Sequence, residues 1–407
     1  MQVSNSRVLI FPTLNDPTTS SKTILALKNS HQVLPLSGSI NPTDPNSTYA
    51  ATRILFKEFF SREFKDSLEA IAEQGSNSWM DETFRHWLIK FVDADFYDIP
   101  EERTYIYIVP VDNDIQNLNN SHIAKLSEED LKTHCPEEYK EYTRARDYYQ
   151  EAEQTGTIQY YGVLNCEQSE PWRNHYEALY SGILREKGDR WLNYTAVDSR
   201  LPTESELAKL RGLVVSGANH AAYDDAPFHE ALYKVLQKAF HEYPQLKLLG
   251  VCFGHQVLAH CLGGKAEKMQ GLNVPFMTNL DLVQAKPELK QKSYYKKTLE
   301  KLGIADVDKF VAVEAHGDHV AALPAKAEIL GNSETTNVEM WGLEEKVFCT
   351  QFHPEFNEGL MKLKLLQEIT YEEAVNAKMM NRFLDSEKNL TLDRTFQITL
   401  CKNFIKN

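Results

Sequence analysis

The chain has 407 residues, of which 42% are hydrophobic and 25% charged, and its formal net charge at pH 7 is −14. This length and composition are typical of an ordinary globular protein of two or three domains. The negative charge argues against nucleic acid as a partner. Because the chain has no run of about 18 apolar residues, we also expect no transmembrane segment.

The six cysteines are scattered without the Cys-x-x-Cys or paired Cys/His spacing of a zinc site, and they suggest no disulfide framework. The first residues lack the basic start and long apolar stretch of a signal peptide. We therefore expect an intracellular, cytoplasmic protein with no metal and no other cofactor. Since about the first forty residues are rich in Ser and Thr and poor in acidic residues, a mitochondrial location is the alternative.

Residues 1–155 are predicted to form a separate α+β region of unknown role. The expected elements are strands at 8–11 and 104–111, helices at 54–71 and 81–91, and a helical stretch from 127 to about 156. Aromatic residues recur at helical spacing, and we interpret them as a small hydrophobic core: Trp79, Phe84, Trp87, Phe91, Phe96 and Tyr97. The region contains no catalytic motif, so we expect at most a protein partner here.

From residue 160 the pattern changes to alternating strands and helices. Strands are expected at 160–166, 191–197, 212–216 and 246–251, with helices at 176–185, 204–210 and 227–242. This alternation predicts an α/β fold with a mostly parallel open sheet and helices on both faces. We assign this domain to residues 156–365 and a C-terminal helical tail to residues 366–407, with helical stretches at 360–366 and 371–383. Active sites in such sheets form at the carboxyl ends of the strands.

Cys252 follows the last of these strands, within Gly250-Val251-Cys252-Phe253-Gly254. The apolar run after it predicts a helix that stops at Gly263-Gly264. A nucleophilic side chain on such a strand-to-helix turn is exposed for attack, and flanking glycines keep the neighbouring backbone clear of it. The helix N-terminus also favours the thiolate over the thiol. An isolated cysteine is usually a small buried hydrophobe. Here the predicted strand, the turn, the helix that follows and its stop together favour a nucleophile.

A base for this cysteine is expected at His353, which follows an apolar strand at 347–351. His353 would lie at the same sheet edge as Cys252. Glu355, two residues further on, could accept a hydrogen bond from the imidazole and fix its tautomer. The candidate nucleophile, base and acid are therefore Cys252, His353 and Glu355.

With these residues in place, the sequence resembles the class I glutamine amidotransferase family. The resemblance covers about half of the chain and rests on four stretches in the family's order, which are 213–219, 250–256, 316–324 and 351–355. It implies a flavodoxin-like amidotransferase fold. It also implies a small-molecule γ-glutamyl substrate, glutamine or a γ-glutamyl peptide, that is hydrolysed through a γ-glutamyl thioester on Cys252.

The resemblance implies further site residues. The backbone N–H groups of Ala218 and Phe253 would hold the oxyanion, and Gln256 would help to hold the substrate. Alanine at position 218 can serve if the backbone there needs no positive φ. The lack of a glycine-rich phosphate loop predicts that no ammonia-using reaction occurs within the chain. Two kinds of enzyme are then possible. The chain is either a stand-alone hydrolase or a glutaminase subunit that supplies ammonia to a separate synthase.

The sequence leaves two alternatives open, a metal site and a structural role. His316, Asp318 and His319 have side chains that could bind a metal, but we favour a hydrogen-bonded loop network. The chain could also be an enzyme-fold subunit of a larger assembly, with residues 1–155 or the C-terminal tail as contact surfaces. The complete set of Cys252, His353 and Glu355 favours an active enzyme.

Overall fold

The computed structural model describes residues 7–15, 22–28, 33–34, 36–39, 46, 50–54, 95–99, 104–110, 123–173, 175–269, 279–287, 289–357, 360 and 390–407. Contacts divide the chain into two compact units, Met1–Gln159 with Arg185–Trp191, and Tyr160–Leu184 with Leu192–Asn407. The helices predicted at 54–71, 81–91, 360–366 and 371–383 lie wholly or largely outside the described residues.

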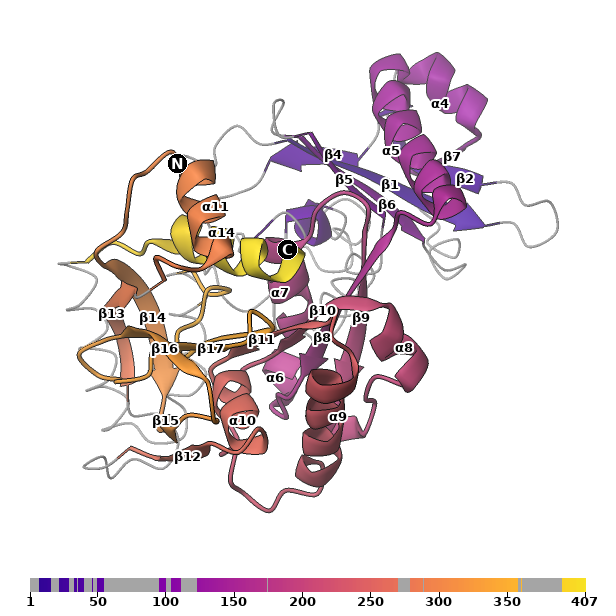
Figure 1. Cartoon of the computed structure of the whole chain (residues 1–407). Coiled ribbons are helices and arrows are strands. Elements are labelled where there is room, and N and C mark those ends of the chain that lie inside the picture. Colours follow the sequence, from indigo (N-terminus) through magenta and orange to yellow (C-terminus); the bar gives the residue numbers. More distant parts are fainter. Residues whose placement is uncertain are drawn as a thin grey trace. The chain divides into compact units, whose positions relative to one another are not determined.

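The N-terminal unit contains a sheet, the helices α4 and α5 and a helical segment at residues 50–54, as the α+β expectation requires (Figure 1). The strand order is β3-β2-β1-β6-β5, with β4 paired to β1 and β7 to β2. The bounds are β1 (Arg7–Asn15), β2 (Lys22–Lys28), β3 (Val33–Leu34), β4 (Leu36–Ser39), β5 (Asp95–Ile99), β6 (Thr104–Pro110) and β7 (Ile123–Leu126). The helices are α4 (Glu128–His134) and α5 (Pro136–Thr155). Pro136 begins α5 and Gly156, with φ 66°, caps its end, so both punctuation residues act as predicted.

The core of this unit lies between the sheet and α5. Leu9 and Phe11 of β1 pack with Ile106 of β6 and with Tyr142 of α5. Of the aromatic residues assigned to a hydrophobic core, Phe96 and Tyr97 are described and both are buried.

The second unit is built on a nine-stranded sheet with the order β14-β13-β16-β17-β18-β11-β10-β8-β9. Its strands are β8 (Gln159–Asn165), β9 (Asp189–Thr195), β10 (Leu210–Val215), β11 (Lys247–Val251), β13 (Asn279–Pro287), β14 (Phe310–His316), β16 (Glu328–Asn332), β17 (Met340–Leu343) and β18 (Val347–Thr350). A separate pair is formed by β12 (Lys265–Lys268) and β15 (Asp318–Ala322). The described helices are α6 (Glu170–Arg173), α7 (His175–Leu184), α8 (Glu204–Lys209), α9 (His229–Glu242), α10 (Phe253–Cys261), α11 (Ser293–Leu302) and α14 (Arg394–Lys406), with a short 3-10 turn at Ala196–Asp198.

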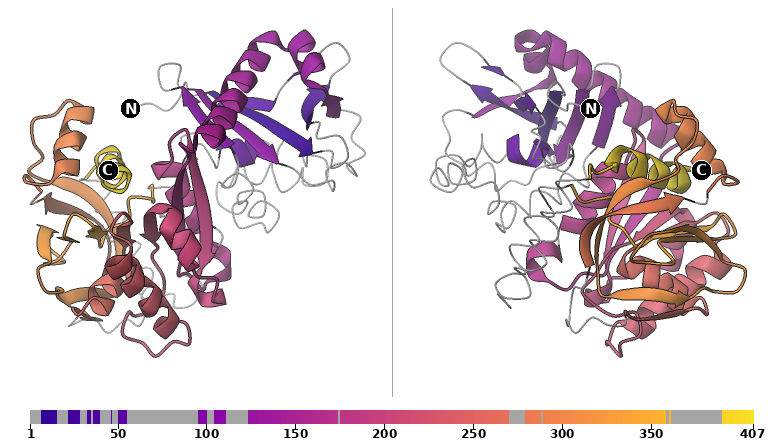
Figure 2. Two further views of the ribbon diagram at one scale, coloured as in Figure 1. Left: turned by 45° about the vertical axis from the view of Figure 1, so that its right-hand side comes forward. Right: turned by 90° about the vertical axis from the view of Figure 1, so that its left-hand side faces the viewer.

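Helices cover both faces of this sheet. Neighbouring residues of a strand point to opposite sides, so each face presents side chains on which a helix can pack. Leu213 and Val215 of β10 belong to the core formed with α9 and α10. Gly212, the residue before Leu213, faces the other way, and a Cβ there would lie 2.3 Å from Ile405 of α14. Figures 1 and 2 show α14 on one side of the sheet and α9 and α10 on the other. The predicted α/β architecture is therefore confirmed.

The parallel part of the sheet consists of β18, β11, β10 and β8. The carboxyl ends of these strands lie at one edge, so the residues that follow them are brought together. The strands β14, β13, β16 and β17 extend the sheet in antiparallel fashion. This extension was not expected from the sequence, and it supplies one wall of the site described below.

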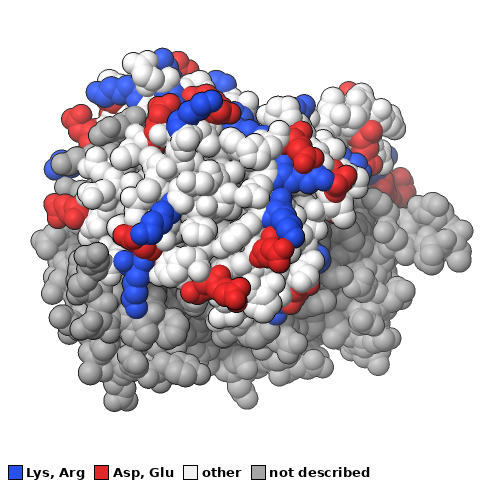
Figure 3. Space-filling view, turned by 60° about the horizontal axis from the view of Figure 1, so that its bottom comes forward, with Lys and Arg blue, Asp and Glu red and all other residues white. Residues whose placement is uncertain are grey.

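On the face shown in Figure 3, acidic and basic side chains are interspersed over the described residues. Lys234 pairs with Glu230 at 2.6 Å, and Lys238 pairs with Glu204 and Glu242 around α9. Such exposed pairs contribute little to stability.

Among the helices that the structure describes, none is long and apolar enough to cross a membrane.

Candidate active site

Cys252 occupies the turn between β11 and α10, as the sequence predicts. Its backbone has φ 52° and ψ −105°, a conformation that L-residues rarely adopt. The N–H of Cys252 donates to the carbonyl of Thr350 at 2.9 Å, and its own carbonyl accepts from the N–H of Gln256 at 3.1 Å. These bonds hold the thiol at the N-terminus of α10, where the helix dipole favours negative charge.

The two flanking glycines are required by close backbone approach. A Cβ at Gly254 would lie 2.1 Å from the carbonyl oxygen of Val215, and one at Gly250 would lie 2.6 Å from the carbonyl oxygen of Gly254. Both distances are far below van der Waals contact. The Gly-x-Cys-x-Gly spacing is therefore a steric requirement of this turn.

The strained backbone at Cys252 leads to a stability prediction. Cys252→Gly and Cys252→Ala both remove the thiol, but only glycine adopts a positive φ without a penalty from its Cβ. We expect the glycine variant to exceed the alanine variant in free energy of unfolding by about 1 kcal/mol, less than the full strain because glycine also gains entropy when unfolded. Urea denaturation of the two variants measures this difference. An alanine variant as stable as the glycine variant would contradict strain at this turn.

His353 and Glu355 form a buried hydrogen-bonded pair after β18. The Nδ1 atom of His353 lies 2.7 Å from Oε1 of Glu355, and both side chains are almost fully buried. The hydroxyl of Tyr180 in α7 donates to the same Oε1 at 2.9 Å. Arg394, the first residue of α14, donates to the backbone carbonyl of Glu355 at 3.0 Å. Two helices distant in sequence therefore hold Glu355 in place.

The imidazole of His353 lies next to Cys252. A Cβ placed on Gly217 would lie 3.2 Å from Cε1 of His353 and 3.6 Å from Cβ of Cys252, so the two side chains meet at this glycine. Burial alone would lower the pKa of His353, but the negative charges of Glu355 and of the Cys252 thiolate outweigh it and raise this pKa to about 10. The ring of Phe356 stacks on the imidazole with centroids 4.7 Å apart. The structure thus brings together the three residues predicted from two separate motifs.

The two residues whose backbone N–H groups are expected to hold an oxyanion, Ala218 and Phe253, both lie near Cys252. Phe253 is the first residue of α10, so its N–H has no acceptor within the helix. Ala218 follows β10 and lines the same cavity as Cys252. It is not among the residues with positive φ, so alanine fits there without strain. Neither N–H has an acceptor among the described residues.

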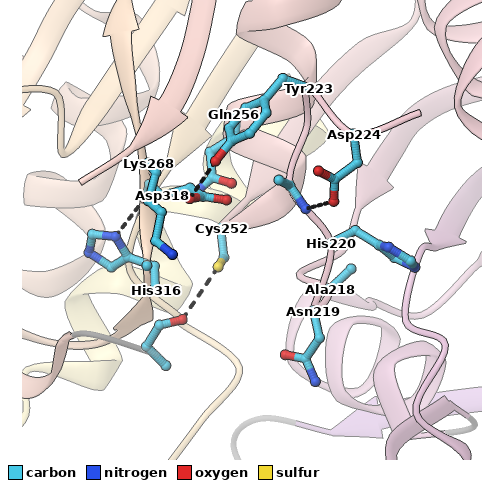
Figure 4. A pocket seen from close by; sticks show the side chains of 13 residues that line it. Ala218, Asn219, His220, Tyr223, Asp224, Cys252, Gln256, Lys268, His316 and Asp318 are labelled. Carbon is cyan, nitrogen blue, oxygen red and sulfur yellow. Dashed lines mark hydrogen bonds between the residues drawn. The ribbon is translucent and has the colours of Figure 1, made fainter. Parts of the chain in front are cut away.

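A cavity of about 230 Å³ opens beside Cys252 (Figure 4). Its walls come from the loop after β10, from α10, from the end of β12 and from the turn between β14 and β15. The lining residues with polar or charged side chains are Asn219, His220, Tyr223, Asp224, Cys252, Gln256, Lys268, His316 and Asp318. Gln256 lies in this wall, where its Nε2 donates to the carbonyl of Asp318 at 2.9 Å and to Oε1 of Gln351 at 3.1 Å.

The loop residues considered as metal ligands make hydrogen bonds and ion pairs. Nδ1 of His316 lies 2.8 Å from the carbonyl oxygen of Asp318, whose carboxylate accepts from the hydroxyl of Tyr223 at 3.0 Å. Nε2 of His319 lies 3.8 Å from Oε1 of Glu267. The contacts of His316 and Asp318 connect the cavity wall to the loop after β10.

Two residues that contact Glu355 carry no signal in the sequence. Tyr180 lies in an apolar helix face, and Arg394 lies 39 residues after Glu355 with no motif around it. Their contacts with Glu355 arise from the packing of α7 and α14 on the sheet.

The site can be compared with known proteins. A model of the class I glutamine amidotransferase family ("Glutamine amidotransferase class-I") matches residues 175–372. Gamma-glutamyl peptidase 3 of Arabidopsis thaliana is 33% identical over 57% of this chain and 88% of the relative, and gamma-glutamyl peptidase 4 of the same plant is 27% identical over 63% of this chain and 97% of the relative. A GMP synthase of Porphyromonas gingivalis is 29% identical, but over only 41% of this chain and 29% of the relative.

Proposed function

The chain belongs to the class I glutamine amidotransferase family and is an enzyme of this type, and from this premise we propose that it hydrolyses γ-glutamyl amides through a thioester on Cys252. The observation that carries the proposal is the meeting of Cys252, His353 and Glu355 at one sheet edge. A strained turn presents the thiol, and a buried acid 2.7 Å from the imidazole orients the base. Such an arrangement suits nucleophilic acyl transfer.

In the proposed reaction, the Cys252 thiolate attacks the γ-carbonyl carbon of the substrate. The N–H groups of Phe253 and Ala218 stabilise the oxyanion that develops. The imidazolium of His353 then gives its proton to the leaving nitrogen, so the C–N bond breaks and ammonia or an amine departs. Glu355 keeps Nδ1–H of the imidazole engaged through both proton transfers.

The second half of the reaction releases glutamate. Neutral His353 removes a proton from water, and the resulting hydroxide attacks the thioester carbonyl. When the tetrahedral intermediate collapses, the C–S bond breaks and Cys252 leaves as a thiolate beside the newly protonated imidazole. The enzyme thereby returns to its starting state.

The cavity suits the γ-glutamyl group in size and charge. Its volume of about 230 Å³ is below the roughly 300–1,000 Å³ of pockets for drug-sized ligands. A γ-glutamyl group carries an α-ammonium and an α-carboxylate. The carboxylates of Asp224 and Asp318 and the ammonium of Lys268 line the cavity and offer a partner for each charge. Gln256 would hold the substrate from α10.

The relatives favour γ-glutamyl peptides over glutamine as substrates. The chain covers almost the whole length of two proteins named γ-glutamyl peptidases, whereas it matches less than a third of the GMP synthase. We therefore place the chain with hydrolases that release an amine. A glutaminase that supplies ammonia to a separate synthase is the competing assignment.

Glutamate release from three kinds of substrate tests the proposal. We expect hydrolysis of γ-glutamyl dipeptides, slower hydrolysis of glutamine, and none of the isomeric α-glutamyl dipeptides, whose scissile bond lies at a different carbon. Intact-protein mass spectrometry during turnover should show one added γ-glutamyl group on the wild-type chain. A folded protein that releases glutamate from no γ-glutamyl compound would refute the proposal, and hydrolysis of glutamine alone would favour the glutaminase.

A further inference from the structure

Three buried ionisable side chains have no part in the reaction proposed above, and one of them, His316, lines the cavity. Glu314 and His316 belong to β14, and Glu339 precedes β17. Glu314 and Glu339 are fully buried, and His316 is 3% exposed. The Nε2 atom of His316 lies 3.5 Å from Oε2 of Glu314. Burial of such groups is costly unless their charges are matched.

The imidazole of His316 faces an acceptor on each side. Its Nδ1 lies 2.8 Å from the carbonyl oxygen of Asp318, and its Nε2 faces the carboxylate of Glu314. A neutral imidazole has one N–H group, whereas an imidazolium has two. Two acceptors therefore favour the imidazolium. The same Asp318 carbonyl accepts from Gln256, so the ring is connected to the cavity wall.

The two carboxyl groups compete for the same donor. Oγ of Ser333 lies 3.3 Å from Oε1 of Glu314 and 3.0 Å from Oε2 of Glu339, but it has one proton to donate. Thr335 donates to Oε2 of Glu314 at 2.6 Å. Oε1 of Glu339 has no donor among the described residues. Two carboxyl groups in contact cannot both be charged, so Glu314 keeps the charge and Glu339 carries the proton.

We propose that Glu314 and Glu339 share one proton and thereby hold His316 as an imidazolium beside Cys252, where it acts as a positioning residue that favours the thiolate. The thiol of Cys252 donates to the carbonyl oxygen of Ala315, the neighbour of His316, with Sγ and O 3.6 Å apart. Cys252 and His316 both line the cavity (Figure 4). A nearby positive charge makes a cysteine more nucleophilic at neutral pH. The effect on hydrolysis rests on the function proposed above, whereas the charge of His316 does not.

The electrostatic environment agrees with this assignment. Burial alone would lower the pKa of His316, but Glu314 and the charge of Cys252 raise it. Burial alone would raise the pKa of Glu314, but contact with His316 lowers it to about 2. Burial and the charge of Glu314 raise the pKa of Glu339 far above its usual value.

Three other ionisable groups face His316 from the neighbouring elements. Asp318 of β15 favours its positive charge. His319 of β15 and His255 of α10 would oppose that charge, but burial lowers the pKa of both, to about 3 for His255. At pH 7 these two imidazoles are neutral. The charge of His316 is therefore set mainly by its ion pair with Glu314.

A pair of isosteric substitutions tests the proposal. In Glu339→Gln the side-chain amide replaces the protonated carboxyl and still donates to Glu314, so we expect kcat/KM within about threefold of wild type. In Glu314→Gln the charge is lost, so His316 becomes neutral. We expect kcat/KM at pH 6 to fall about tenfold and the acidic limb of its pH profile to move up by about one pH unit, because the thiolate forms less readily.

The charge of His316 is measured directly from the nitrogen and proton chemical shifts of its imidazole, assigned by their loss in His316→Gln. We expect a doubly protonated ring at pH 7 to 8 in the wild type and in Glu339→Gln, and a neutral ring in Glu314→Gln. A wild-type ring that titrates near 6.5, or equal losses in the two glutamine variants, would overturn the proposal. The wild-type titration decides this even if a variant does not fold or no γ-glutamyl amide is hydrolysed.

Discussion

Replacing Cys252 with alanine is expected to reduce kcat for γ-glutamyl amides by about 10⁴-fold or more, because no other group can form the proposed thioester. Loss of a nucleophile in a preorganised acyl-transfer site has effects of this size, while the oxyanion donors leave some residual catalysis. The measurement is kcat from initial rates of glutamate release, together with the loss of the γ-glutamyl adduct in mass spectra.

Cys261→Ala provides a matched control for this substitution. Cys261 is a buried cysteine on the same helix, α10, and it lies outside the cavity lining. Its loss should leave kcat per folded molecule unchanged. If Cys252→Ala retained the wild-type rate while both variants remained folded, the covalent mechanism would be wrong.

The second large effect is expected at Glu355. Glu355 accepts hydrogen bonds at Oε1 from both His353 and Tyr180. A glutamine there presents either an N–H₂ group or a single uncharged oxygen, so the imidazole loses the partner that fixes its tautomer and stabilises its charge. We expect Glu355→Gln to reduce kcat by up to about 10⁴-fold, as the loss of an orienting carboxylate does in triads of this kind.

The pH dependence of Glu355→Gln has a definite sign. In the wild type the pKa of His353 is raised to about 10, so the imidazolium is present below this pH and lost above it. Without the carboxylate the pKa of His353 falls, and the alkaline limb of the kcat profile should move to lower pH. Tyr180→Phe removes one hydrogen bond to Glu355 but no charge, so we expect a loss of about tenfold or less and little shift of the limb. An unshifted alkaline limb in Glu355→Gln would argue against the His353 assignment.

The local elements of the chain follow from short-range patterns in the sequence. The turn at Cys252 was predicted from two glycines and the apolar run before them, and the structure shows that each glycine avoids a backbone clash. Pro136 and Gly156 likewise mark the ends of α5. These features depend on neighbours a few residues apart, so propensity and sterics suffice to predict them.

The antiparallel half of the second sheet and the packing of α14 were not predicted. The strands β13, β14, β16 and β17 are separated by loops of varied length, and their pairing depends on contacts between distant residues rather than on hydrophobic period. α14 lies within residues assigned above to a C-terminal tail, yet it packs on β10 and β11. Arg394 reaches Glu355 only because of this packing.

The sequence by itself determined which chemistry the site residues could perform, because a cysteine at a glycine-flanked turn and a histidine followed by a glutamate are local motifs. Only the tertiary structure decided how those groups are charged. Separate elements pack together, so that Tyr180 and Arg394 contact Glu355 and Glu314 faces His316. Ser333 bridges Glu314 and Glu339. Protonation in a buried site depends on distances between residues far apart in the chain, and no local pattern encodes those distances.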